Sequence, residues 1–462
     1  MPATSADVVV LGGGPAGVAA AWWAARRGCS VVLLERSARV GGLAGSFEVA
    51  GQRVDLGSHR LHPDIDAGIL AVLTDLLGSD LQLRRRNGRI RLGGAWLKFP
   101  LSPTDLLRNA PRGLALGFGR DLITSPMRSP RADTFAEQVR AGPGPTIARH
   151  FYDPYARKLF GVDPADLSGD LFRRRVSASS SLAIAARALR GSGGSAAFMS
   201  PRRGFGQISE AMAGAAVDAG ADVRLGAAAT SVEPRAGAAR VGVGDQMVDT
   251  KLVLSSIPAP ALVRLMGSEA PERVRSAAAA LSYRRAALVY LILDVPQFSP
   301  FDATYLPEPT TPVTRLSEPK NYRDNPDDPS DTTVLCAEVP YSPGDDVDQA
   351  DDELLANRVI ESLSASGLTV DPAATRVVRV DALYPIYTLD YGHRIRTVEQ
   401  WFDDDDLPIV PFGRQALFAH DNTHHGLAMA KAAVESIRPD GSFDHRVWET
   451  SKAIFQFHTV AD

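Results

Sequence analysis

The sequence has few cysteines, no long apolar run and no large excess of charge of one sign. Its 462 residues include two cysteines, Cys29 and Cys336, which are too few for a disulfide framework and lie in no paired metal-ligand spacing. The longest apolar run, Ala286 to Leu293, is far shorter than the roughly 20 residues that a membrane-spanning helix needs. The formal net charge of −4 provides no broad basic field for nucleic acid. We therefore expect a cytoplasmic protein with no integral membrane segment and no nucleic-acid partner.

An apolar strand runs directly into a glycine-rich turn near the start of the chain. In such a turn Gly12 permits the tight bend, Gly14 lets the backbone approach a pyrophosphate, and Gly17 lets the following helix pack on the strand. The helix N-terminus then faces the phosphates. Glu35 closes the next apolar run, at about the expected distance of roughly 20 residues. This order predicts a dinucleotide site in which Glu35 binds the ribose hydroxyls of the adenosine.

Three residues beside this turn complete the predicted nucleotide contacts. Pro15 and Ala16 open the helix, so their backbone faces the pyrophosphate. Arg36 follows Glu35, and because Glu35 takes the ribose position, we interpret Arg36 as a solvated charge at the border of the cofactor rather than as a reader of a 2′-phosphate.

A second pair of glycines, Gly41 and Gly42, follows Glu35 closely, and Gly57 comes soon after it. Glycine pairs allow backbone to approach a ligand. A second close approach so soon after the first predicts a cofactor that extends past its pyrophosphate, as FAD does. Near the other end of the chain, Gly413 precedes a helix that Asn422 or Thr423 can cap, which leaves free backbone N–H groups and a positive dipole end.

These motifs resemble those of the large FAD superfamily that contains amine oxidases, protoporphyrinogen oxidase, phytoene desaturases and UDP-galactopyranose mutase, and the resemblance spans nearly the whole sequence. It includes the segment from Pro201 to Gly206 with the strand around Val232. Neither cysteine lies in the C-terminal flavin motif, so noncovalent FAD is expected. The resemblance implies the following FAD-binding residues: Gly12, Gly14, Pro15, Ala16, Gly17, Glu35, Arg36, Gly41, Gly42, Leu43, Gly57, Ser58, His59, Val232, Gly413, Arg414, Asp421, Asn422 and Thr423.

The fold implied is α/β, with a Rossmann-like FAD-binding domain of the glutathione-reductase type and an inserted α+β substrate domain. An Arg/Ser/Ala-rich stretch, 173–194, is expected to be a mobile arm. The expected parts are a discontinuous FAD-binding domain over 1–95, 200–278 and 395–462, a helical part of the substrate domain over 96–199, and a β-rich part over 279–394.

Three histidines are candidate catalytic residues. His59 and His62 follow the second glycine pair closely, and because histidine titrates near neutral pH, either could hydrogen-bond the flavin or move a substrate proton. His424 enters the last long helix, whose N–H groups are predicted to face the pyrimidine edge of the flavin. The alternative for each is a histidine satisfied within its own loop. His420 and His424 are four residues apart, but His420 precedes the expected helix cap, so no metal site is predicted.

Three stretches are most similar to the mutase branch: His59 to His62, Trp96 to Pro100, and Tyr155 to Gly161. Two departures from that branch are Phe160 in place of a tryptophan and Arg60 in place of an apolar residue. The candidate substrate-binding residues are Arg60, Tyr155, Lys158, Tyr305, Tyr387 and His425.

The leading hypothesis is an FAD-dependent oxidoreductase that takes hydride to flavin N5 from a small or medium organic substrate, by amine or alcohol oxidation or by desaturation, with O2 or another acceptor reoxidising the flavin. The alternative is a redox-neutral mutase acting on a nucleotide sugar. A third class is a flavin-binding protein retained for interaction alone. A diphosphate substrate would demand convergent arginines, whereas a neutral or amine substrate would prefer an apolar and aromatic pocket. A homodimer is left open.

Overall fold

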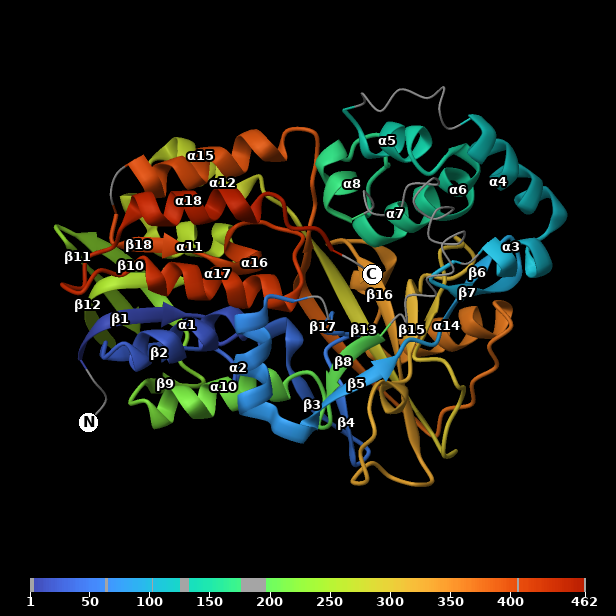
Figure 1. The fold of residues 1–462 in the computed structure, drawn as a ribbon, viewed down its shortest axis with the longest axis horizontal. Coiled ribbons are helices and arrows are strands. Elements are labelled where there is room, and N and C mark those ends of the chain that lie inside the picture. The colour runs from blue at the N-terminus through green and yellow to red at the C-terminus, as the bar shows by residue number, and fades with distance from the viewer. Residues whose placement is uncertain are drawn as a thin grey trace.

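The computed structural model describes residues 4–62, 65–101, 103–124, 133–175, 197–404 and 407–460. Figure 1 shows two bodies side by side, a layered α/β body on the left and, on the right, a second sheet with a group of helices above it. Of the stretch 173–194, expected to be a mobile arm, residues 176–194 lie outside the described part.

The left body is built on a seven-stranded sheet whose central strand β1 (Ser5–Leu11) pairs in parallel with β2 (Val31–Leu34) and β12 (Gln246–Ser255). Valine and leucine fill these strands on both faces, as expected for a buried parallel sheet. The other strands are β9 (Asp222–Arg224), β10 (Ala229–Arg235), β11 (Ala238–Val243) and β18 (Ile409–Pro411).

Helices cover both faces of this sheet. One core joins it to α1 (Pro15–Arg26), α10 (Gln207–Asp218), α17 (Thr423–Glu435) and parts of α2 (Ala67–Leu77) and α18 (His445–Phe455). A second core joins the opposite face to α11 (Ala259–Met266), α12 (Glu272–Ala279) and α15 (Tyr391–Asp404). The expected Rossmann-like arrangement is confirmed.

The right body contains a second seven-stranded sheet, in the order β17 (Ala374–Pro385), β13 (Tyr283–Leu293), β16 (Thr333–Tyr341), β15 (Arg315–Ser317), β14 (Ala303–Tyr305), β6 (Gly88–Leu92) and β7 (Ala95–Phe99). Helix α14 (Asp352–Ala365) packs on one face of it. The other face packs against the hairpin of β3 (Ser46–Val49) and β4 (Gln52–Asp55), which belongs to the N-terminal part of the chain. This contact brings the two bodies together where β4 ends.

The helices above the second sheet are α3 (Pro103–Asn109), α4 (Arg112–Thr124), α5 (Phe135–Ala141), α6 (Pro145–Ile147), α7 (Asp153–Phe160) and α8 (Gly169–Arg175). The remaining elements include β5 (Leu81–Arg85), β8 (Ala197–Pro201), α13 (Asp346–Gln349) and α16 (Gly413–Ala416). Strand β6 lies inside the predicted range 1–95 but is hydrogen-bonded into the second sheet. The domain boundaries stay predictions. Among the described helices, none combines the length and the apolar character that crossing a membrane requires.

Candidate functional site

The first glycine turn leaves several backbone donors free. The Gly13 amide donates to Glu35 Oε2 (2.6 Å), and the Gly12 amide donates to a carbonyl oxygen of β2. The amides of Gly14, Ala16 and Gly17 meet no acceptor among the described residues. Because these donors stand at the positive end of α1, the turn is suited to bind an anion.

Gly14 and Gly42 face each other across this turn. A Cβ at Gly14 would have only the Gly42 Cα within 4.0 Å, whereas a Cβ at Gly17 would lie 1.8 Å from the Gly12 carbonyl oxygen. The second glycine pair is fastened to the first turn, because the Gly41 amide donates to the Gly13 carbonyl (2.8 Å). Gly14 therefore keeps space open beside the free donors, while Gly17 serves the packing of α1 on its strand.

The start of α17 lies against the start of α1. A Cβ at Gly413 would come within 3.0 Å of the Ala16 Cβ, and a Cβ at Gly426, in the first turn of α17, would come within 3.7 Å of it. The Thr423 and His424 amides find no acceptor in the described part of the chain. Two helix N-termini with unused N–H groups thus converge, and their dipoles favour negative charge between them.

The other predicted cofactor residues lie around this convergence. Both Glu35 carboxylate oxygens accept backbone N–H bonds, from Gly13 and Ser37, and each retains a lone pair for a ribose hydroxyl. Arg36 is exposed, and Val232 is buried in the core beneath the sheet, so only its backbone can face a nucleotide. Pro15 and Leu43 are half-buried at the same end.

The histidine-bearing loop after β4 reaches the same region. His59 stacks on Phe205 with ring centroids 5.2 Å apart, and its Nε2 bonds the Leu56 carbonyl (2.9 Å). Burial lowers the pKa of His59. His62 lies near His424, whose pKa falls to about 4 because of burial and the neighbouring His62. His62 and His424 are therefore neighbours, whereas His59 is hydrogen-bonded within its own loop, as the alternative prediction for it held.

Asp421 is buried before α17 and is surrounded by basic groups. Its Oδ2 lies 3.3 Å from His458 Nδ1, and its Oδ1 lies 3.6 Å from Arg174 and 3.7 Å from His425 Nδ1. The ligand atoms of Asp421, His425 and His458 fall within 4.8 Å of one another, but the two imidazoles stack in parallel at 4.1 Å and cannot direct both lone pairs at one ion. His425 Nδ1 also accepts the Asn422 amide (3.2 Å).

Two predicted substrate-binding residues, Lys158 and Tyr387, donate hydrogen bonds to backbone carbonyls within the protein. Lys158 Nζ donates to the carbonyls of Leu306, Glu308 and Val313, at 2.6, 2.7 and 3.1 Å, and burial lowers its pKa to about 7. Its three donors are thus used to hold the loop between β14 and β15. The Tyr387 hydroxyl, on a side chain that is 1% exposed, donates to the Phe418 carbonyl (2.8 Å). Neither side chain retains a free group for a substrate.

Arginines and tyrosines gather next to the loop that carries His59 and His62. The Arg60 guanidinium pairs with Asp302 (2.9 Å) and donates to the Tyr322 hydroxyl (3.0 Å). Tyr305 lies beside it, and both Arg60 (3.4 Å) and Arg86 (3.5 Å) donate to its hydroxyl. The remaining candidate of this side, Tyr155, is half-buried and stacks on Phe151.

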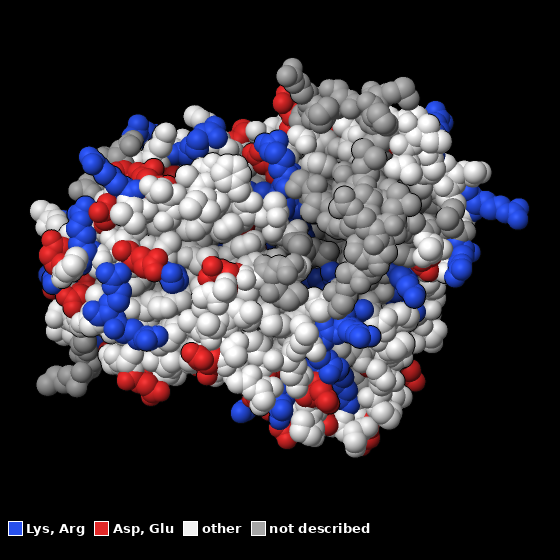
Figure 2. All heavy atoms as spheres, viewed as in Figure 1, with Lys and Arg blue, Asp and Glu red and all other residues white. Residues whose placement is uncertain are grey.

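A second group of basic side chains surrounds Tyr384. The guanidinium carbons of Arg175 and Arg414 each lie 5.3 Å from the centre of its ring. Arg414 donates to the Leu383 carbonyl (3.1 Å), and no carboxylate pairs with it in the described residues. Burial lowers the pKa of Arg414. Figure 2 shows several Lys and Arg side chains along the line where the two bodies meet.

Sequence reasoning missed Arg86, Arg175, Arg315, Tyr322 and Glu338 as members of this region. None lies in a recognisable motif, and each arrives from a strand or helix end whose register the sequence does not reveal.

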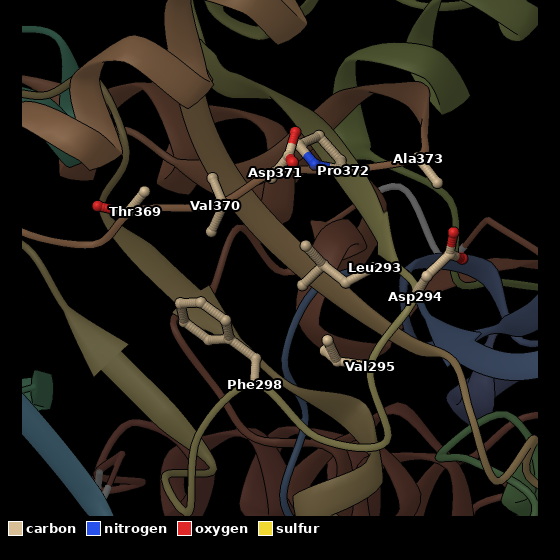
Figure 3. Close-up of a pocket in the computed structure, with 9 residues that line it drawn as sticks. All are labelled: Leu293, Asp294, Val295, Phe298, Thr369, Val370, Asp371, Pro372 and Ala373. Atoms are coloured by element: carbon tan, nitrogen blue, oxygen red, sulfur yellow. The ribbon is translucent and has the colours of Figure 1, made fainter.

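One surface hollow lies away from all of these residues. Its volume is about 420 Å³, and Figure 3 shows Leu293, Phe298 and Val370 around it, with Asp294 and Asp371 at its border. No residue predicted for the site lines it.

Comparison with known proteins shows the family to which the chain belongs. Residues 15–438 match the profile of the flavin containing amine oxidoreductases, and the chain belongs to this family. It is similar, at 40% identity over 82 residues, to a putrescine oxidase of Kocuria rosea. The matched segment covers 18% of this chain and 17% of that protein. The first matching curated relatives are likewise covered over about a fifth of their length, 19%.

Two solved structures share the fold over nearly all of the chain. Reduced UDP-galactopyranose mutase superposes with a TM-score of 0.83 at 20% identity, covering 99% of this chain and 100% of the other. A candidate protoporphyrinogen oxidase of Exiguobacterium sp. 255-15 gives 0.74 at 22%, covering 95% and 99%. At this identity the likeness concerns the fold alone.

The chain is thus a member of a flavin oxidoreductase family, with FAD as its cofactor. The residues present fit FAD, because two helix N-termini offer unused donors and Gly14 leaves the space that a pyrophosphate needs.

Gly14→Val should give a folded but colourless protein. Gly14 has φ −70°, which any residue adopts, and its Cβ meets no close atom, so the added side chain fills the cradle rather than straining the fold. Visible absorbance and FAD affinity of the purified protein check this. Gly214→Val, on an open face of α10, is the matched control and should stay yellow. Unchanged FAD affinity in Gly14→Val would refute the pyrophosphate assignment.

Acidification should destabilise the protein through His424. Its folded pKa of about 4 lies below the ordinary 6.5, so between these values the unfolded chain binds more protons than the folded one. Stability is therefore full above pH 6.5 and falls as the pH drops towards 4, by at most about 1.4 kcal/mol per pH unit for this group. His424→Gln should flatten the slope of unfolding free energy against pH. His393→Gln, at an exposed position, should leave the slope unchanged.

Proposed function

We propose that this flavin enzyme acts on an anionic substrate that carries a phosphate or diphosphate. The observation that carries the proposal is the convergence of Arg175 and Arg414 on the ring of Tyr384, with Arg60 and Arg86 at Tyr305. Guanidinium groups bind phosphate oxygens in pairs, and the aromatic rings between them can hold a planar or sugar group. Arg60 is paired with Asp302, but no carboxylate pairs with Arg414 among the described residues, so its charge would repel an amine cation and amine oxidation is disfavoured among the expected reactions.

The reaction proposed is hydride removal from a C–H bond next to oxygen, or a desaturation. Bound FAD would supply the hydride acceptor at N5, and O2 or another acceptor would reoxidise it. In this proposal His62, and His59 through the ring nitrogen that Leu56 does not engage, would hold or move the substrate proton. The Thr423 and His424 amides would stabilise negative charge at the pyrimidine edge. Neutral His424 suits this position, since its low pKa keeps it uncharged near neutral pH.

A second candidate is a redox-neutral rearrangement of a nucleotide sugar. It is supported by the same arginines, because a diphosphate needs convergent positive charge, and by similarity to a mutase that bears a UDP-sugar in its name. The site residues named from the sequence remain proposals, with Lys158 and Tyr387 set aside. Noncovalent attachment of FAD, a cytoplasmic location and a homodimer also remain proposals.

The two reactions differ in how they respond to the oxidation state of the flavin. Under anaerobic conditions, a substrate oxidised by the enzyme should bleach the visible flavin band without added reductant. A panel of sugar phosphates, nucleotide sugars and polyols, with putrescine as the cationic comparison, checks this. Bleaching by a phosphorylated compound supports oxidation, and turnover only after dithionite reduction supports rearrangement. Bleaching by putrescine alone would overturn the anionic-substrate proposal.

Arg175→Met should raise the KM for the phosphorylated substrate about tenfold or more, because a charged hydrogen bond to an anion is lost. Arg173→Met is the matched control from the same helix end. Its side chain is 61% exposed and pairs with Asp170, so the KM should not change. Equal effects of the two substitutions would contradict the placement of the anion beside Tyr384.

A further inference from the structure

Two ion pairs hold the loop that carries His59 and His62 to the second-sheet body, Arg60 with Asp302, described above, and Arg315 with Glu338. Arg315 on β15 and Glu338 on β16 are direct cross-strand partners. The Arg315 Nε donates to Glu338 Oε1 (2.9 Å) and one terminal nitrogen donates to Oε2 (2.9 Å), which makes the pair bidentate. Both side chains are largely buried, 14% and 6% exposed, so the geometry is protected from water.

Both main-chain groups of Ser58 are bound by this pair. The Ser58 amide donates to Glu338 Oε1 (2.9 Å), and Arg315 donates to the Ser58 carbonyl (3.2 Å). Gly57, immediately before, has φ +86°, and a Cβ there would lie 3.4 Å from the same Glu338 oxygen. The carboxylate therefore lies directly under the bend of the chain, where only glycine fits well.

A second hydrogen bond fixes the start of the same loop. The Tyr290 hydroxyl, from β13, donates to the Asp55 carbonyl (2.6 Å). The segment between Asp55 and Ser58 is thus fastened at both ends to the second sheet, and His59 lies between Ser58 and Arg60, which is itself bound to Asp302. His59 cannot shift relative to that sheet unless one of these bonds breaks.

We propose that Glu338 is a positioning residue that, through Ser58, fixes the histidine loop against the flavin site. In this role Glu338 acts through the backbone of Ser58 and not through contact with the substrate or with a histidine ring. Its effect on catalysis rests on the proposed function of His59 and His62, whereas its effect on the loop does not.

The charged groups around His59, Glu338 among them, also shift its pKa. Burial lowers the pKa of His59, Asp55 and Glu338 raise it, and Arg315 lowers it. Loss of the Glu338 charge should therefore lower the pKa of His59 further and leave the positive charge of Arg315 uncompensated.

The test compares Glu338→Gln with Glu318→Gln in the full-length, FAD-loaded protein. Glu318 is a matched control, since it is also buried beside β15 but accepts from the Phe298 and Ser299 amides and not from the histidine loop. Amide hydrogen exchange over 56–62 should be about tenfold faster in Glu338→Gln, the factor expected for a lost charged hydrogen bond, and unchanged in Glu318→Gln. Equal exchange over 56–62 in Glu338→Gln and the parent would overturn the proposal.

Two further measurements separate positioning from general destabilisation. The pKa of His59, followed by NMR of labelled histidine with His59→Gln as the assignment control, should fall in Glu338→Gln and stay in Glu318→Gln. Arg315→Lys, which keeps the charge but loses the bidentate pair, serves if Glu338→Gln does not fold, and should also speed exchange over 56–62.

With the substrate identified as above, Glu338→Gln should lower kcat more than it raises KM. Faster exchange with unchanged kcat would support the positioning of the loop by Glu338 and refute the catalytic role of the histidines. Unchanged exchange would refute the positioning of the loop by Glu338, whatever the activity of the variant.

Discussion

The structure depends on unsatisfied backbone donors at two helix ends. The first turns of α1 and α17 lie against each other at Ala16 and Gly426, and amides in both turns find no acceptor among the described residues. Helix-end N–H groups without protein partners are satisfied by water or by a ligand, and the positive ends of the two helices favour an anionic or carbonyl-bearing ligand. The glycines around the convergence keep the ligand's space free of side chains.

The second sheet adds what the nucleotide fold alone lacks. It reaches the first body through the hairpin of β3 and β4, and it brings arginines and tyrosines next to the loop that carries His59 and His62. In the proposed function, one body binds the cofactor and the arginines of the other select the charge of the substrate. Since the two bodies share the loop from Asp55 to His62, cofactor and substrate contacts are mechanically connected.

Much of the cofactor region could be predicted, because its chemistry depends on local sequence. The bend at Gly12, the open face at Gly14 and the cap at Asn422 each follow from a few adjacent residues. The substrate side could not be predicted in the same way. Glu338 meets Ser58 across 280 positions, a contact that depends on strand register. The carbonyl partners of Lys158 could not be predicted either, because they lie on a loop about 150 positions away in the sequence.

The central strand of the nucleotide sheet has a partner that is synthesised much later. Residues Val8 and Leu252 are paired in β1 and β12, and α1 packs on α17 near the end of the chain. During translation, β1 and the apolar face of α1 therefore emerge from the ribosome long before their partners exist. Until then these surfaces are exposed to self-association, so production of the protein should benefit from slow expression and from abundant chaperones.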